Sequence, residues 1–338
     1  MHQQFLGNTP LANFFFKRLV AKGNLSSTQI KTHKHVFITG LARAGTTAIL
    51  NDIYSTNEFA SFLYRHMPFI LSPKLAMIFS KFNNKNQIFQ ERYHKDGIMV
   101  NTNSPECLDE VFWIKANKDY YSYSLNAELI TNQEILNGYN YLLSSFSKFQ
   151  NKERLLIKNN NNHIRLKCLS KYFTESFFLV IFREPIYQSL SLLRMHKRFS
   201  DLQTSDSYIL DYMNLIGHRE FGLGAKSFIY NNDISYSQNN YSMDSINYWL
   251  EQWINCYSWL LENNFYSFRN VYFVCYEKLC KDPKYLKNLY KILEINKISQ
   301  SNFSLKNKEI CFTKYEINES LIDKAHAIYD KMKNLKLD

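Results

Sequence analysis

The segment from His35 to Thr47 reads HVFITGLARAGTT and is the most informative part of the chain. Its first residues are mostly β-branched, aromatic or apolar, which is typical of a buried strand. Gly40 follows that strand, and residues 46–54 have helical character. A short apolar strand that turns through glycine into a helix predicts the opening unit of an α/β domain.

The two glycines of this segment, Gly40 and Gly45, have the spacing of a nucleotide phosphate loop. In such a loop, backbone N–H groups and the helix N-terminus bind an anion, and glycine allows close approach. An ATP- or GTP-binding loop needs Lys after the second glycine, but Thr46 stands there and Arg43 is the cation of the loop. With Thr46 and Thr47 as hydroxyl donors, the loop suits a 5′-phosphate or phosphosulfate. A glycine turn without a ligand is the alternative.

Strand-like and helix-like segments alternate along the rest of the chain. This predicts an α/β fold of P-loop type, with three layers and a central, mostly parallel sheet flanked by helices. Further strands are expected at 155–158, 177–182 and 271–275, and helices at 104–117, 135–149, 164–173, 185–199, 245–263 and 283–293. Residues 200–240 have weak periodicity and are expected to form an irregular insertion, such as a lid. We expect one domain over 1–338, with a core at about 35–295, an N-terminal extension 1–34 and a C-terminal helical tail 296–338.

A second candidate anion site follows the strand at 177–182. Arg183 stands at its carboxyl end, Pro185 begins a helix, and Ser191 lies about two turns into that helix. Ligands of open α/β sheets bind at the carboxyl ends of strands, so the guanidinium and the hydroxyl can converge on one anion. Each residue alone is commonplace, and the pattern gains weight only beside the phosphate loop.

Together the two motifs resemble those of the PAPS-dependent sulfotransferases, where PAPS is 3′-phosphoadenosine 5′-phosphosulfate. The resemblance implies a 5′-phosphosulfate site made by Gly40, Arg43, Ala44, Gly45, Thr46 and Thr47, and a 3′-phosphate site made by Arg183 and Ser191. The segments LIKN at 156–159 and CYEKLCKDP at 275–283 are also similar to the family. The resemblance covers roughly residues 35–295 and implies PAPS as co-substrate, with no metal.

Two further segments look like a bacterial, carbohydrate-sulfotransferase-like branch that acts on surface polysaccharides. They are YRHMPF at 64–69 and SPECLDEVFW at 104–113. That branch usually has Asp where this chain has His66, and the Lys-Gly element of the cytosolic eukaryotic enzymes is not evident. Resemblance to the bacterial branch implies a carbohydrate hydroxyl as the acceptor.

Sulfuryl transfer needs a cation at the leaving phosphate and a base for the acceptor hydroxyl. Arg43 is the natural cation. The candidate bases are His66, His94, Glu106 and Glu110. His66 ranks first because it follows the first strand–helix unit, although a packing histidine is an alternative. For Glu110 an ordinary exposed helix carboxylate is the favoured alternative, and Lys158 could reach the nucleotide or the acceptor, or remain solvated.

Composition restricts the partners of the chain. Its 41 Lys and Arg against 30 Asp and Glu give a formal net charge of +11, which favours an anionic partner. No apolar stretch is long enough to span a membrane and no export signal is evident, so we expect a cytoplasmic protein, with contact to the inner face of a membrane left open. Six cysteines without metal-ligand spacing indicate reduced thiols and no metal site.

The alternatives to a sulfotransferase are a P-loop NTPase or kinase with a degenerate loop and a non-catalytic anion-binding protein. We expect no nucleic acid partner, and the oligomeric state stays open.

Overall fold

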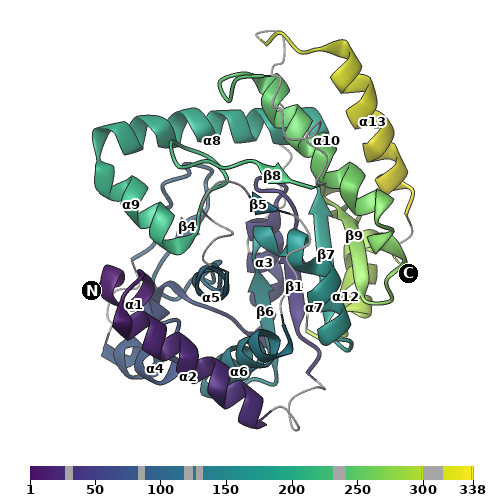
Figure 1. Cartoon of the computed structure of the whole chain (residues 1–338). Helices are drawn as coiled ribbons and strands as arrows, with labels where there is room; N and C mark the ends of the chain where they lie inside the picture. The colour runs from purple at the N-terminus through teal and green to yellow at the C-terminus, as the bar shows by residue number, and fades with distance from the viewer. Residues whose placement is uncertain are drawn as a thin grey trace.

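The structure is a computed structural model that describes residues 1–26, 33–82, 88–117, 125–126, 132–230, 241–297, 299, 315–335 and 337. Its largest sheet has five strands in the order β2–β6–β1–β7–β9, and every described pairing within it is parallel. These strands are β1 Val36–Thr39, β2 Phe59–Ala60, β6 Arg154–Lys158, β7 Phe177–Phe182 and β9 Val271–Cys275. Helices flank the sheet, which confirms the predicted α/β architecture (Figure 1).

The central strands are apolar on both faces, as a sheet covered on both sides requires. Side chains alternate along each strand, so Phe178 and Val180 of β7 join one buried cluster while Leu179 and Ile181 join another. The second cluster contains residues of α3 Thr46–Tyr54 and α12 Pro283–Ile292. The first contains residues of α6 Gln133–Phe149, α7 Leu166–Tyr172, α10 Ile246–Glu262 and α13 Glu319–Lys333.

A third buried cluster lies beside the carboxyl ends of the strands. It joins α8 Pro185–Ser205, α9 Ser207–Ile216 and the start of α10, and it includes Ala42 of the phosphate loop. In Figure 1, α8 and α9 form an angled arm above the strand ends. This arm encloses the phosphate loop on one side and therefore positions part of the site.

The N-terminal helices pack on the main body. They are α1 His2–Leu6 and α2 Pro10–Ser26, and α2 lies along α6 (Figure 1). Gly23 and Gly138 allow this close approach, because a Cβ on Gly23 would meet the Asn137 carbonyl oxygen at 2.3 Å. Buried Leu6 and Leu19 belong to the same cluster as the sheet. The predicted division into one domain with terminal extensions stays a prediction.

Most predicted elements are present with boundaries shifted by a few residues, and two predictions were wrong. The helix expected from Ser104 begins at Glu110, as α5 Glu110–Ala116, because Pro105 instead forms an isolated bridge with Leu63. Part of the expected irregular insertion is helical, since α8 runs to Ser205 and α9 follows it. Residues 231–240 of that insertion lie outside the described residues.

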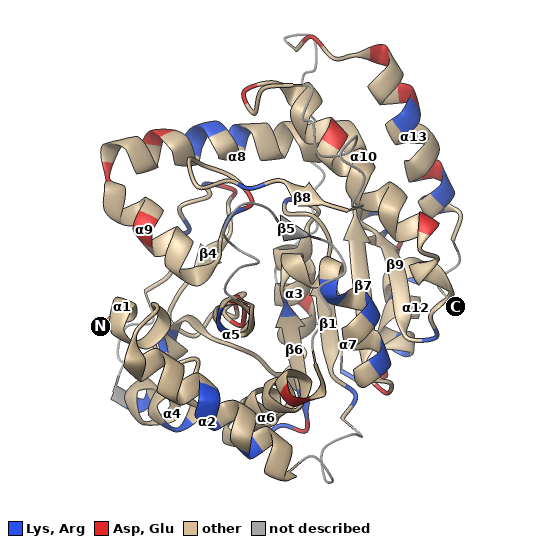
Figure 2. Cartoon of the chain, viewed as in Figure 1, with Lys and Arg blue, Asp and Glu red and all other residues tan. Residues whose placement is uncertain are grey.

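The N-cap residue of α6 is Asn132. The side chain of Asn132 accepts from the Ile135 backbone N–H, and Thr131 lies outside the described residues. The five described cysteines, Cys107, Cys168, Cys256, Cys275 and Cys280, are free thiols, and Cys311 lies outside the described residues. No helix in the described ranges is both long and apolar enough to cross a membrane. Basic and acidic segments alternate along α13 (Figure 2).

Candidate active site at the phosphate loop

The phosphate loop takes its shape from two glycines that no other residue could replace without strain. Gly40 has φ +124° and Gly45 has φ +97°, both in the left-handed region. A Cβ on Gly40 would lie 2.3 Å from the Ile181 carbonyl oxygen. A Cβ on Gly45 would lie 2.3 Å from the ring of Tyr276. Strand β7 and the segment 275–283, which contains Tyr276, therefore contact the loop from two sides.

The loop is also held from α8. Gln188 donates to the carbonyl oxygens of Leu41 at 3.2 Å and Ala42 at 3.0 Å, and the Trp253 indole donates to Gln188 at 3.0 Å. Within this rigid frame Arg43 has φ +69°, which is uncommon for a residue with a side chain. Such strain persists where the surroundings enforce it, and it concentrates at functional sites.

Arg43 joins the two motifs that the sequence places 140 or more residues apart. Its Nε donates to the Ser191 hydroxyl at 3.1 Å, and its Nη1 lies 2.9 Å from an Asp96 carboxylate oxygen. Burial, followed by the charge of Arg92, lowers the pKa of the Arg43 guanidinium, and Arg183 adds to that effect. The structure therefore brings the loop arginine, Ser191 and Arg183 to one edge of the sheet.

Arg183 follows the last residue of β7, and its side chain lies against the segment 275–283. Its guanidinium sits 5.3 Å from the centre of the Tyr276 ring, and its Nε is 3.9 Å from a Glu277 oxygen. Glu277 also accepts from the Tyr329 hydroxyl at 3.0 Å. The segment 275–283 thus supports both the loop, through Tyr276, and Arg183.

A hairpin from which the sequence singled out only His94 lies against the loop. It consists of β3 Gln90–Glu91 and β4 Met99–Val100, and its turn carries Arg92, His94 and Asp96. The Arg92 Nε is 3.0 Å from Asp96, and its Nη1 is 3.4 Å from the Thr47 hydroxyl. Burial opposes ionisation of Asp96, but Arg92 and Arg43 outweigh it and hold the pKa of that carboxyl well below its usual range. Asp96 is therefore an anion held between two arginines, one of which, Arg43, belongs to the loop.

Glu106 and Lys158 extend this charged group. The Lys158 Nζ is 3.0 Å from Glu106, whose other oxygen accepts from the Tyr64 hydroxyl at 3.0 Å. Burial would raise the pKa of Glu106, but Lys158 and Arg92 outweigh burial and lower it. Glu106 is thus an ionised carboxylate paired with cations and a poor proton acceptor. Three cations (Arg43, Arg92 and Lys158) face two carboxylates (Asp96 and Glu106), and we refer to these five residues as the loop cluster.

His66, the first-ranked candidate base, lies in the core and not at the loop. It is 1% exposed, its Nδ1 accepts from the Leu63 backbone N–H at 3.0 Å, and it packs on Phe146. Burial lowers the pKa of His66 to about 3. The basic nitrogen is occupied and sealed from solvent, which argues against a role as proton acceptor. Its sequence position gave no indication of this burial.

Glu110 is likewise sealed. Its oxygens lie 2.6 and 2.9 Å from the Arg165 guanidinium, and Asn159 donates to it at 2.8 Å. The side chains of Arg165 and Glu110 are 0% and 3% exposed. The two charges of this pair neutralise each other inside the protein. The structure therefore favours a structural role for Glu110 over the predicted catalytic one.

His94 lies at the site, beside a second histidine that the sequence did not suggest. The rings of His94 and His218 are stacked with centroids 6.0 Å apart. Burial, followed by the charges of Arg92, His218 and Arg43, lowers the pKa of His94 well below its usual value. The Nδ1 of His218 forms a short hydrogen bond with Glu220. Nothing in the local sequence marks His218 or Glu220, because both reach the loop only through the turn that follows α9.

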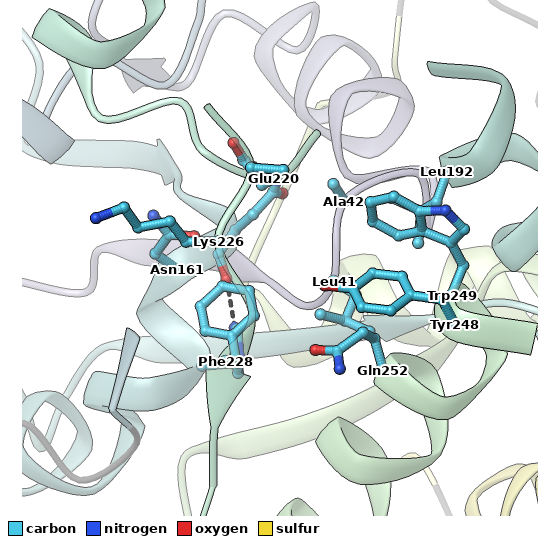
Figure 3. Close-up of a pocket in the computed structure, with 13 residues that line it drawn as sticks. Leu41, Ala42, Asn161, Leu192, Glu220, Lys226, Phe228, Tyr248, Trp249 and Gln252 are labelled. Atoms are coloured by element: carbon cyan, nitrogen blue, oxygen red, sulfur yellow. Dashed lines mark hydrogen bonds between the residues drawn. The ribbon is translucent and has the colours of Figure 1, made fainter. Parts of the chain in front are cut away.

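A cavity lies behind the loop, between α8, α10 and the segment 220–228 (Figure 3). Its volume is about 30 Å³, roughly the room of one water molecule. The aromatic rings of Phe228, Tyr248 and Trp249 line it. In Figure 3, Trp249, Tyr248 and Gln252 lie on one side of it, and Phe228, Lys226 and Asn161 lie on the opposite side.

Two observations bear on ligands in this cavity and at the loop. The Asn161 side-chain oxygen is buried and has no hydrogen-bond partner among the described residues, so a ligand group or a water molecule would be needed to satisfy it. Among the described residues, no group of three or more His, Cys, Asp or Glu is placed to hold a metal ion.

Comparison with known proteins gives matches among solved structures only. No protein-family model and no curated protein sequence matches the chain. Sulfotransferase STF1 from Mycobacterium tuberculosis H37Rv is similar in structure, with a TM-score of 0.52 and 12% identity over 96% of this chain and 84% of that one. Sulfotransferase STF9 from Mycobacterium avium is similar with a TM-score of 0.53 and 12% identity over 99% of this chain and 84% of that one. The chain therefore has the fold of these sulfotransferases.

Proposed function

We propose that the protein is a sulfotransferase that moves the sulfuryl group of PAPS to a hydroxyl group of a carbohydrate. The observation that carries this proposal is the hydrogen bond from Arg43 to Ser191, which unites the phosphate loop with the second anion motif. A loop with Thr46 in place of Lys, beside two arginines, suits a nucleotide with two separate phosphates. The fold shared with two sulfotransferases supports the same activity.

In this mechanism the loop residues bind and orient the donor. Backbone N–H groups of the loop, that of Thr46 included, and the hydroxyl of Thr47 would hold the 5′-phosphosulfate, while the Thr46 hydroxyl donates to Asn160. Arg183 and Ser191 would hold the 3′-phosphate. The acceptor oxygen attacks sulfur, the bond between sulfur and the bridging oxygen breaks, and the electron pair stays on the 5′-phosphate. Arg43 would stabilise that developing charge.

The loop cluster supports an anionic ligand directly. Arg43 and Arg92 already hold a carboxylate, since Asp96 lies 2.9 Å from the first and 3.0 Å from the second. A guanidinium fork that binds carboxylate binds phosphate and sulfate with the same geometry. We infer that the phosphosulfate replaces Asp96 as the partner of Arg43.

The cavity behind the loop supports a carbohydrate acceptor. Sugar-binding surfaces combine a flat aromatic face with side chains that can both donate and accept hydrogen bonds. Trp249 and Tyr248 supply rings, and the Asn161 side-chain oxygen supplies a hydrogen-bond acceptor. The cavity is too small for a sugar ring, so a single substituent of the acceptor would enter it.

The test is binding of 3′,5′-adenosine bisphosphate, compared with Mg-ATP and 5′-AMP, by thermal unfolding and calorimetry. At 100 times its dissociation constant a ligand stabilises the native state by about 2.7 kcal/mol, which gives a measurable shift. We expect a shift with the bisphosphate that Arg183→Ala abolishes, and a weaker shift with 5′-AMP. A shift with Mg-ATP alone would contradict the proposal and support the NTPase alternative.

A matched control separates a pocket from diffuse positive charge. Arg269 is an 86% exposed arginine paired with Glu175 on the surface, so Arg269→Ala should leave bisphosphate binding unchanged. Equal losses in Arg183→Ala and Arg269→Ala would indicate non-specific anion binding. Transfer of labelled sulfur from PAPS to a panel of neutral polysaccharides then tests the reaction itself.

A further inference from the structure

A chain of hydrogen bonds runs from the phosphate loop to His218. The Thr46 hydroxyl donates to the Asn160 side-chain oxygen at 3.1 Å, and the Asn160 amide donates to Glu220 at 3.2 Å. The other Glu220 oxygen meets the Nδ1 of His218. Three segments far apart in the sequence therefore fix one imidazole relative to the loop.

The two ends of this series of hydrogen bonds differ in solvent exposure, as an oriented base requires. Thr46 and Asn160 are 3% and 8% exposed, so the anchor is rigid and shielded from water. The His218 side chain is 25% exposed, against 13% for Glu220. The imidazole is therefore the part of the chain of hydrogen bonds that a substrate can reach.

The turn that presents His218 is also fixed. Gly217 ends α9 with φ +76°, and a Cβ there would meet the Glu110 side chain at 2.7 Å. The Phe221 ring packs on the imidazole from one side and His94 stacks on it from another. Little rotation of the His218 ring is compatible with these contacts.

We propose, on the basis of the proposed function, that His218 is the general base of sulfuryl transfer and that Glu220 and Asn160 are its positioning residues. Glu220 accepts a hydrogen bond from the Nδ1–H group, which leaves the lone pair on Nε2 for the acceptor hydroxyl. As the acceptor oxygen forms its bond to sulfur, its proton moves to Nε2. The electron pair of the breaking sulfur–oxygen bond leaves with the 5′-phosphate, and the imidazolium later returns its proton to solvent.

The surrounding charges agree with this role. Burial would raise the pKa of Glu220, but His218 and Lys158 outweigh it and lower that pKa to about 2, so the carboxylate stays ionised and able to stabilise an imidazolium. His94 faces the ring and carries no charge near neutral pH, because its pKa is lowered.

The first experiment needs no acceptor. Nitrogen NMR of histidine-labelled protein, with His218→Gln to assign the signal, reports which ring nitrogen of His218 carries the proton. We expect the neutral ring to be protonated on Nδ1 in wild type and to lose that preference in Glu220→Gln. Protonation on Nε2, or a ring that stays doubly protonated at the pH of turnover, would overturn the proposal.

The second experiment follows labelled sulfur from PAPS to water and to dextran. We expect His218→Gln to reduce turnover by about 10²-fold or more, within the usual range for loss of a general base, with bisphosphate affinity changed less than about twofold. Glu220→Gln should reduce turnover with little change in KM and should alter the pH profile, while Glu220→Asp should restore part of the rate. The matched control is His326→Gln, which removes a second His–Glu pair, 3.1 Å from Glu184, and should change nothing.

The outcomes separate the two proposals. Wild-type turnover in His218→Gln overturns the role of His218 and leaves the sulfotransferase proposal intact. Failure of wild type to bind the bisphosphate overturns the proposed function, and with it the reaction that His218 would serve. If wild type binds the bisphosphate but transfers sulfur to neither probe, the NMR result decides the role of His218.

Discussion

Two groups of charged side chains lie near the phosphate loop, and they differ in how much solvent reaches them. The sealed group consists of the Glu110–Arg165 ion pair, whose side chains are 3% and 0% exposed, and the neutral Asn159 amide that donates to Glu110. In the loop cluster, the side chains of Arg43 and Asp96 are 16% and 13% exposed. The residue types are similar, and the geometry of each pair is good.

The difference lies in what each group can exchange. The sealed ion pair has a fixed partner for each charge, and no ligand can reach it. In the loop cluster an incoming anion can take the place of Asp96 on Arg43, because that arginine is close to the surface. The proposed function therefore assigns a structural role to the paired charges in one region and a binding role to those in the other, and solvent exposure distinguishes the two regions.

Removing one partner of the sealed pair should have the largest effect. Glu110→Ala leaves the Arg165 guanidinium buried without its counter-ion, and we expect a loss of about 3–5 kcal/mol in the free energy of unfolding. Urea denaturation at neutral pH measures it. Glu294→Ala breaks a surface pair with Lys34, both about half exposed, and should cost less than about 1 kcal/mol. Equal losses in the two variants would contradict the distinction between sealed and exposed pairs.

Arg43→Ala should reverse this pattern, with a large effect on binding and a small one on stability. Loss of a charged hydrogen bond to phosphate costs about 1.5–3 kcal/mol, roughly a 10- to 100-fold loss of affinity for the bisphosphate. Calorimetry measures that affinity, and urea denaturation should show a smaller change than in Glu110→Ala. Affinity unchanged in Arg43→Ala would mean that the loop is a structural turn.

The sequence predicted the framework of this site because that framework is local. Strand β1, the two glycines and helix α3 are contiguous, and their residue types alone predict the loop. The sequence also placed Arg183 and Ser191 at the carboxyl ends of the strands, beside the loop, but it did not predict the hydrogen bond from Arg43 to Ser191.

The rest of the site depends on contacts that the sequence does not encode locally. Arg92 and Asp96 reach the loop through a hairpin, and His218 reaches it through a turn after α9. His66 was a reasonable candidate by residue type, but its burial depends on how α6 packs against the segment that carries it. A single sequence gives no measure of such burial.

A similar reason explains why the helix predicted to begin at Ser104 begins at Glu110 instead. Local signals favoured a helix there, but the bridge between Leu63 and Pro105 fixes this backbone in an extended form. Tertiary contacts commonly override such local preferences. The helix then begins at Glu110, which directs that carboxylate toward Arg165 and into the core.

Acid should reveal the buried histidines. His66 has a native pKa of about 3, against 6.5 for the ordinary side chain. Below pH 6.5 the unfolded chain therefore binds a proton that the native protein does not, and stability falls as the pH falls toward the native pKa. Between pH 7 and pH 5 this costs about 2 kcal/mol for one such histidine.

Denaturation of wild type and His66→Gln at the two pH values measures this contribution. The variant should lose about 2 kcal/mol of the difference between pH 7 and pH 5, whatever its stability at neutral pH. His35, with a native pKa of about 3, and His163, with one of about 4, keep acting in the variant, so some acid sensitivity remains. An unchanged pH dependence in His66→Gln would contradict the buried, neutral state of this ring.

The smallest expected effect concerns Asp96, and its sign is the informative part. Asp96→Asn keeps the shape of the side chain and one acceptor oxygen but removes a negative charge beside Arg43 and Arg92. If Asp96 occupies the place of the phosphosulfate, affinity for the bisphosphate should rise by about three- to tenfold, or about 0.7–1.4 kcal/mol, and should depend more steeply on salt.

The opposing effect is loss of order in the two arginines, since Asp96 also holds them in place. The amide can still accept one hydrogen bond, whereas the repulsion between a carboxylate and an incoming anion disappears completely, so the gain should exceed the loss. Calorimetry at two salt concentrations separates the two effects. Weaker binding in Asp96→Asn would show that Asp96 positions Arg43 and Arg92 for the nucleotide, and the loop cluster would then resemble the sealed group more closely than its exposure suggests.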